Sequence, residues 1–210
     1  MTDAVVFDLD GVLLDSARAI IGCINDALEE LGEPPRPPAD LRRFVGPPLA
    51  DGFSELVGPD RAGELVVAYR TRYATASLEL TTVFPGMVEV LEELGADRPL
   101  AVATSKPLAY SKPLCDHLGL TPYFAVIEGP SMAEIEPKTD TLRRALDGLE
   151  LAPGADAPMI GDRLHDVEAA HANGLRCIGV LWGFGTEEEL RAAGADAIVT
   201  APEELSAIVL

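Results

Sequence analysis

Two short apolar runs in this sequence are each followed by a pair of acidic residues. The pairs are Asp8 with Asp10, and Asp162 with Asp166. Carboxylates that crowd together repel one another unless a cation compensates their charge. Oxygen ligands without a cluster of His or Cys favour a hard ion, and a site with few protein ligands and room for water favours Mg²⁺ over Ca²⁺. The four carboxylates therefore predict a magnesium site.

A hydroxyl group and an ammonium group extend this set. Thr104 follows another apolar run, and Lys138 stands before the run that ends at Asp162. A metal ion and a lysine can neutralise the oxygens of a phosphoryl group, and an aspartate can attack phosphorus to form an aspartyl-phosphate. These residue types together predict phosphoryl transfer.

The elements that carry these residues alternate between apolar runs and helix-like segments, which predicts an α/β fold. The runs are too short for helices, and their alternation with helices indicates a Rossmann-like parallel sheet core with helices on both faces. Such sheets bind ligands at the carboxyl ends of their strands, where the polar residues stand. The predicted strands are Val5–Phe7, Leu100–Ala103, Ala125–Ile127, Pro158–Ile160, Cys177–Leu181 and a last one near Ala197–Val199, with a terminal helix from Pro202.

One region lacks this alternation. Residues 16–81 contain no clear strand pattern, and a helix with apolar positions at the 3.6-residue period begins after Ser16, which can cap it, and ends at Gly32. Further helical segments follow a proline-rich stretch. We predict an all-helical cap at 16–81, inserted after the first strand into an α/β catalytic core formed by 1–15 and 82–210. Two short connecting segments would join cap and core.

Composition narrows the range of partners. The 210 residues include 16 Lys and Arg against 35 Asp and Glu, a formal net charge of −19. This charge repels polynucleotides and anionic lipid, so we expect neither a nucleic acid nor a membrane partner. The chain has three scattered cysteines, no stretch of about 18 apolar residues, and no basic region before its first apolar run. We expect a cytoplasmic protein with reduced thiols.

The spaced segments FDLDGVLLDS, ATS and GDRLHD, with Lys138 between the last two, resemble motifs one to four of the haloacid dehalogenase-like superfamily. The helical insert is placed like the helical cap of that family. By this resemblance, Asp8 is the nucleophile and Asp10 the general acid and base. The implied magnesium ligands are Asp8, the backbone carbonyl of Asp10, and Asp162, with Asp166 in the surrounding shell.

The resemblance also implies roles for the remaining polar groups. Thr104 and the backbone after it would hold phosphoryl oxygens, and Lys138 would bridge nucleophile and phosphate. Lysine is followed by proline in many phosphatases of the superfamily, whereas here Pro137 precedes Lys138. The other candidates, all for substrate binding, are Ser105, Lys106, Arg163 and, in the cap, Arg43. For His165 a structural role or a place at the substrate rim is expected, since Asp10 already serves as proton carrier.

GDRLHD followed by GVLWGFG and EEEL is closer to the phosphoglycolate phosphatase-like and 5′-nucleotidase branch. We therefore expect a magnesium-dependent phosphatase of a small phosphorylated metabolite. A phosphomutase resembling β-phosphoglucomutase and a non-catalytic binding protein on the same scaffold remain alternatives. A dehalogenase would lack the acid and metal pair, and a phosphonatase would need a cap lysine, which residues 16–81 do not contain. Neither the physiological substrate nor the choice between monomer and homodimer follows from the sequence.

Overall fold

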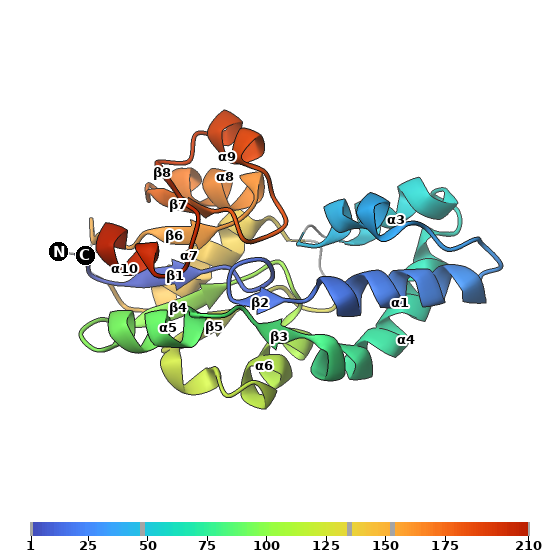
Figure 1. The fold of residues 1–210 in the computed structure, drawn as a ribbon, viewed down its shortest axis with the longest axis horizontal. Coiled ribbons are helices and arrows are strands. Elements are labelled where there is room, and N and C mark those ends of the chain that lie inside the picture. Colours follow the sequence, from blue (N-terminus) through green and yellow to red (C-terminus); the bar gives the residue numbers. More distant parts are fainter. Residues whose placement is uncertain (1, 47–48, 134–135, 152–153, 210) are drawn as a thin grey trace.

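The computed structural model describes residues 2–46, 49–133, 136–151 and 154–209. It has two parts, an α/β core and a helical cap beside it (Figure 1). The core is built on six parallel strands in the order β5-β4-β1-β6-β7-β8. Their bounds are β1 Val5–Phe7, β4 Leu100–Ala103, β5 Val126–Glu128, β6 Met159–Gly161, β7 Cys177–Val180 and β8 Ala197–Val199.

The predicted parallel sheet is confirmed, with strand ends displaced by a residue in β5, β6 and β7. The central strand β1 shows why its sequence is continuously apolar. Val5 and Phe7 pack into one hydrophobic cluster, whereas Val6 packs into another on the opposite face. Because successive side chains of a strand point to opposite faces, a strand covered on both faces has no polar position.

Helices cover both faces of this sheet. Met87 of α5, Leu114 of α6 and Leu205 of α10 share the cluster of Val5 and Phe7. Helices α7, α8 and α9 supply residues to the cluster of Val6. The helix bounds are α5 Met87–Gly95, α6 Leu108–His117, α7 Lys138–Gly148, α8 Leu164–Ala172, α9 Glu187–Ala193 and α10 Glu204–Val209, with a short 3-10 turn at Thr121–Tyr123.

The cap is helical and has a hydrophobic cluster of its own. It consists of α1 Ala17–Glu30, α2 Pro38–Leu41, the 3-10 helix η1 Arg42–Phe44, α3 Leu49–Val57 and α4 Ala62–Leu80. No described residue between 16 and 81 lies in a strand. Ser16 occupies the position before α1, but its side chain makes no capping hydrogen bond, so the predicted cap interaction was wrong.

Cap and core are joined by a small two-stranded ribbon that we did not predict. β2 (Leu14–Asp15) pairs antiparallel with β3 (Thr82–Val83), so the chain enters and leaves the cap side by side (Figure 1). We expected only connecting segments here, because a two-residue strand is too short to show an alternating pattern. The ribbon places the cap beyond the carboxyl end of β1.

The state of the cysteines and the hydrophobicity of the helices can also be read from the structure. Cys23, Cys115 and Cys177 are buried and make no disulfide. In the part of the chain that the structure describes, no helix combines the length and hydrophobicity needed to cross a membrane.

Candidate active site

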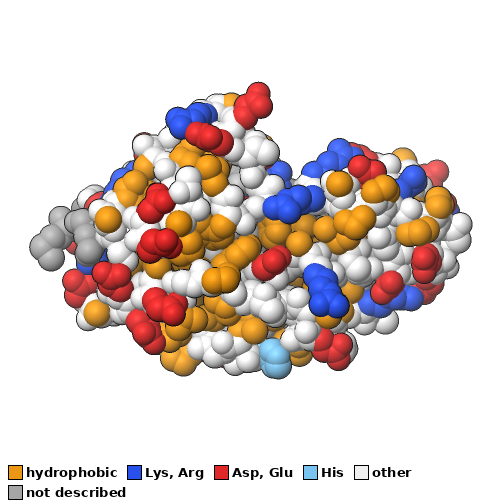
Figure 2. Space-filling view, in the orientation of Figure 1, with side chains coloured by type: hydrophobic (Ala, Val, Ile, Leu, Met, Phe, Trp, Pro, Cys, Tyr) orange, Lys and Arg blue, Asp and Glu red, His pale blue; other side chains and the backbone are white. Residues whose placement is uncertain are grey.

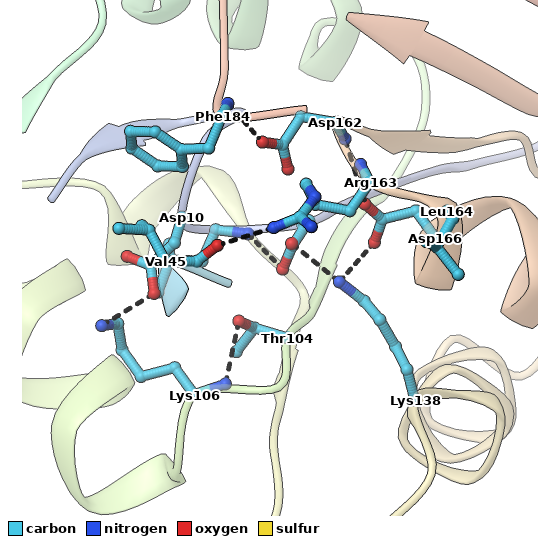
Figure 3. A network of polar contacts seen from close by, with 12 residues as sticks. Asp10, Val45, Thr104, Lys106, Lys138, Asp162, Arg163, Leu164, Asp166 and Phe184 are labelled. Atoms are coloured by element: carbon cyan, nitrogen blue, oxygen red, sulfur yellow. Dashed lines mark hydrogen bonds and ion pairs between the residues drawn. The ribbon is translucent and has the colours of Figure 1, made fainter. Parts of the chain in front are cut away.

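The site lies at the carboxyl ends of β1, β4 and β6, where the polar residues predicted from the sequence converge (Figure 3). Asp8 and Asp10 follow β1, Asp162 follows β6, and Asp166 lies in the first turn of α8. All four side chains are at least nine-tenths buried. Gly11 allows this crowding, because it adopts a positive φ of 89° and a Cβ there would lie 2.2 Å from Asp162 Oδ2.

Lys138, the first residue of α7, neutralises part of this charge. Its Nζ lies 2.7 Å from Asp8 Oδ2 and also contacts Asp166 Oδ1. The lysine side chain is 6% exposed, so both ion pairs are shielded from water. The lysine therefore holds the Asp8 carboxylate from one side while the backbone N–H of Leu9 donates to Asp8 Oδ1 at 2.7 Å.

The second acidic pair is held by backbone N–H groups. Asp162 Oδ2 accepts a hydrogen bond from the N–H of Phe184 at 2.7 Å. Asp166 Oδ2 accepts from the N–H groups of Asp162 and Arg163 at 3.0 and 2.9 Å. Asp166 thus caps the start of α8 and also forms an ion pair with Lys138.

Burial and mutual repulsion disfavour the ionised carboxylates. Burial raises the pKa of Asp8 to about 6, because Lys138 offsets only part of the effect and Asp166 adds to it. Burial and the neighbouring Asp166 and Asp8 also raise the pKa of Asp162 well above its usual range. Ionising these carboxylates together costs free energy in the folded chain, and a bound cation would lower that cost.

The residues present fit a divalent hard cation. Oxygens of Asp8, Asp162 and Asp166 lie within 4.8 Å of one another. Asp162 Oδ1 is buried without a hydrogen-bond partner among the described residues, so a ligand atom is available. Against these three carboxylates stands one ammonium group, that of Lys138, which contacts Asp8 and Asp166. Two negative charges are left over, which matches one Mg²⁺.

Lys106, after β4, is the second buried cation of the site. Its Nζ lies 2.8 Å from Asp10 Oδ2 and donates to the hydroxyl of Tyr73, a cap residue on α4. Burial lowers the pKa of Lys106, but Asp10 and Tyr73 more than compensate and raise it above its ordinary value. Thr104 is buried at the end of β4, and its Oγ1 accepts from the Lys106 N–H at 3.2 Å.

Two arginines join cap and core on the other side of the site. Arg163 pairs with Glu189 at 2.9 Å and donates to the backbone carbonyl of Val45 in the cap at 3.0 Å. From the cap, Arg42 donates to the carbonyl of Gly183 at 2.9 Å. Figure 2 shows a notch between core and cap with Lys and Arg side chains beside it. The cap thus lies against the strand ends that carry the carboxylates.

The structure brings most of the predicted site residues together. It also places Ser105 half-buried beside Thr104, and His165 near Glu168, 3.7 Å between their side chains, on α8. Arg43 is placed differently: it pairs with Glu55 at 2.6 Å and lies over the ring of Phe44, both in the cap. Its assignment to substrate binding stays a prediction from the sequence, and these contacts favour instead a role within the cap. Tyr73 was missed because it has the spacing of an ordinary buried helix residue.

The contacts of Arg43 make a testable contrast with Arg42. The side chains of Arg43 and Glu55 are 62% and 56% exposed, and exposed ion pairs contribute about 0–1 kcal/mol. We expect Arg43→Ala to leave KM for a small phosphate ester near that of the parent, because the contacts of this side chain lie within the cap. Arg42→Ala should raise it more, because it removes a bridge between cap and core. A selective rise in KM for Arg43→Ala, absent in Glu55→Gln, would instead place Arg43 against the substrate.

The structure thus combines an open parallel sheet, a group of carboxylates at the ends of its central strands and a helical cap inserted after β1. The chain belongs to the haloacid dehalogenase-like hydrolase family, whose family model matches residues 5–180. This confirms the superfamily predicted from the motifs, and with it the expectation of a hydrolase.

Relatives of this chain include proteins named as a nucleotidase, a phosphatase and a kinase. The chain is 40% identical to a 5′-nucleotidase of Pseudomonas aeruginosa over 192 residues, 90% of this chain and 86% of that protein. It is 34% identical to a plasmid phosphoglycolate phosphatase of Cupriavidus necator over 214 residues, 98% and 92% of the two. It also matches the tyrosine-protein kinase PtkA of Mycobacterium tuberculosis, 38% identical over 184 residues, 86% of this chain but 62% of that protein.

Solved structures agree on the fold. A predicted phosphatase from Clostridium acetobutylicum superimposes with a TM-score of 0.92 at 36% identity, covering 100% of this chain and 98% of that one.

Proposed function

We propose that this protein is a magnesium-dependent phosphatase that hydrolyses a small phosphate monoester through an aspartyl-phosphate on Asp8. The observation that carries the proposal is the Asp8 carboxylate, held at 2.7 Å from Lys138 within a buried acidic cluster at the end of β1. Asp8 is thereby oriented by one cation and one backbone N–H, with its charge only partly neutralised. Such a carboxylate is a suitable nucleophile toward phosphorus.

In the first step, a carboxylate oxygen of Asp8 attacks phosphorus and the bond from phosphorus to the ester oxygen breaks. Asp10 donates its proton to that departing oxygen, so the product leaves as an alcohol. Lys138 stays beside Asp8 and contributes positive charge next to the transferring group. The hydroxyl of Thr104, at the end of β4, is available to donate to a phosphoryl oxygen.

In the second step, water attacks phosphorus and the bond between Asp8 and phosphorus breaks, which releases inorganic phosphate. Asp10, now deprotonated, accepts a proton from this water and returns to its starting state. The contacts of Arg42 and Arg163 hold the cap against the core, where it limits the access of other water to the aspartyl-phosphate.

Asp8, the backbone carbonyl of Asp10, and Asp162 would hold the metal, with Asp166 beside them. When bound, Mg²⁺ would neutralise phosphoryl oxygens and help to orient the phosphoryl group.

We also propose a small metabolite as substrate and a cytoplasmic location. The helical cap lies against the strand ends, which favours an ester small enough to fit under it. The relatives named 5′-nucleotidase and phosphoglycolate phosphatase support a substrate of this size. The chain's formal net charge of −19 argues against a polyanionic substrate.

A panel of phosphorylated metabolites assayed with Mg²⁺ tests this proposal. The panel should include nucleoside 5′-monophosphates, phosphoglycolate, sugar phosphates and a phosphotyrosine peptide. We expect the highest kcat/KM for a small monoester and the lowest for the peptide, because the cap restricts access to the strand ends. Transfer to a sugar that depends on a bisphosphate activator would indicate the phosphomutase alternative. Absence of turnover on every ester would favour a binding protein.

A further inference from the structure

A lysine as buried as Lys106 needs partners for its ammonium group. It is 7% exposed, and its ammonium group contacts one carboxylate, from Asp10, and one neutral hydroxyl, from Tyr73. The same ammonium lies 4.7 Å from the centre of the Tyr73 ring, within the range of a cation–π contact. Two elements far apart in the chain, α4 of the cap and the loop after β4, therefore share one buried charge.

Tyr73 is itself fixed by a row of aromatic rings that crosses from cap to core. Its ring stacks on Tyr69 at 5.0 Å between centroids and meets Tyr110 of the core helix α6 edge-on at 5.3 Å. Tyr69 in turn meets Phe53 edge-on at 5.5 Å. Aromatic pairs of these geometries are favourable beyond their burial. The position of the Tyr73 hydroxyl thus depends on how the cap sits on the core.

The two oxygens of Asp10 have different surroundings. Oδ2 is held by Lys106 at 2.8 Å, whereas Oδ1 is buried and has no hydrogen-bond partner within the described residues. A carboxylate held by one oxygen has its rotation restricted and its other oxygen available to react. Oδ1 is therefore the oxygen that can reach the departing group.

We infer that Tyr73 is a positioning residue for Asp10: acting through Lys106, it fixes Oδ2 and leaves Oδ1 to exchange the proton with the ester oxygen and with water. The inference rests on the proposed function, in which Asp10 is the general acid and base. The orientation of Asp10 in the core would then depend on the Tyr73 hydroxyl of the cap. When the cap moves away, Lys106 loses one partner and Asp10 loses its fixed orientation.

Tyr73→Phe tests this inference, because it removes the hydroxyl and keeps the ring. The readout is kcat/KM with Mg²⁺ for phenyl phosphate, whose leaving group needs protonation, and for p-nitrophenyl phosphate, whose leaving group needs little. We expect a loss of about 10-fold for phenyl phosphate and of less than about 2-fold for p-nitrophenyl phosphate. A general disturbance of the fold or of phosphate binding would lower both equally, and that result would overturn the inference.

Tyr69→Phe is the matched control, since it removes a hydroxyl from the same aromatic row and keeps the contact between Tyr73 and Lys106. It should leave both kcat/KM values near those of the parent. If Tyr73→Phe behaves like Tyr69→Phe on an active parent enzyme, the inference is overturned while the proposed function stands. If the parent itself hydrolyses neither ester, the proposed function fails first.

A double-mutant cycle tests whether Tyr73 acts through Lys106. Lys106→Met should by itself show the selective loss on phenyl phosphate, and absence of that loss would overturn the inference even should Tyr73→Phe fail to fold. In the Lys106→Met background, adding Tyr73→Phe should cause no further selective loss. An undiminished loss of about 10-fold in that background would mean that Tyr73 acts independently of the lysine, contrary to the inference.

Discussion

Replacing Asp8 by Asn is expected to lower kcat by about 10⁴-fold or more with every ester that the parent enzyme hydrolyses. The substitution removes the carboxylate of Asp8, which is both the proposed nucleophile and a proposed metal ligand. No other described carboxylate can substitute for it, because Asp162 and Asp166 are held by backbone N–H groups and Asp10 by Lys106. Steady-state kinetics with p-nitrophenyl phosphate and Mg²⁺ measure the effect.

The same variant should not be destabilised. The ionised Asp8 carboxylate is disfavoured in the metal-free fold, as its raised pKa of about 6 shows, and an amide removes that charge while Lys138 keeps Asp166 as partner. We expect the midpoint of thermal unfolding without metal to be no lower than that of the parent. Asp147→Asn, on the exposed face of α7, is the matched control and should keep full activity. Near-normal turnover of Asp8→Asn would refute the aspartyl-phosphate mechanism.

Removal of divalent metal should abolish hydrolysis and also lower stability at neutral pH. The acidic cluster has two more negative than positive side chains, so the phosphoryl anion is repelled when no metal is present. Mg²⁺ at about 100 times its Kd would stabilise the fold by about 2.7 kcal/mol, which corresponds to roughly 5 °C or more in a chain of this size. Thermal unfolding with EDTA and then with excess Mg²⁺ measures the shift.

Asp162→Asn should reduce this Mg²⁺-dependent shift, whereas the control Asp147→Asn should retain it.

The stability of the metal-free protein should also depend on pH. The folded pKa of Asp8, about 6, lies above its ordinary value of 3.8, so the folded state binds the proton more tightly and stability falls as pH rises through that window. Full activity after exhaustive chelation would contradict the metal site and favour dehalogenase-type chemistry.

Local sequence was sufficient to predict the sheet and the edge that carries the candidate active site. A strand such as Val5–Phe7 is buried on both faces, so every position must be apolar and the pattern is visible without knowledge of its neighbours. Because parallel strands present their carboxyl ends at one edge of the sheet, the positions of Asp8, Asp10 and Asp162 after their strands predict that they lie together. The α1 helix was equally visible, because its buried positions repeat with the helical period.

Only the tertiary structure decided how the cap meets the core. The ribbon of β2 and β3 has two residues in each strand, too few for a periodic signal, and it forms because the ends of the cap are brought side by side. Arg42 and Arg43 are adjacent and chemically identical, yet one contacts the core at Gly183 and the other pairs with Glu55 in the cap.

Tyr73 shows the same limit at the site itself. Its spacing indicates a buried helix face, but periodicity specifies which side of a helix is buried and not what that side packs against. Its contact with Lys106 joins residues 33 positions apart through a hydroxyl and an ammonium group. The sequence by itself therefore determined the candidate residues for the proposed phosphoryl transfer and their common edge. The packing of the cap's hydrophobic cluster against the core decided which cap residue reaches Lys106, the partner of Asp10, because that choice depends on the relative placement of whole helices.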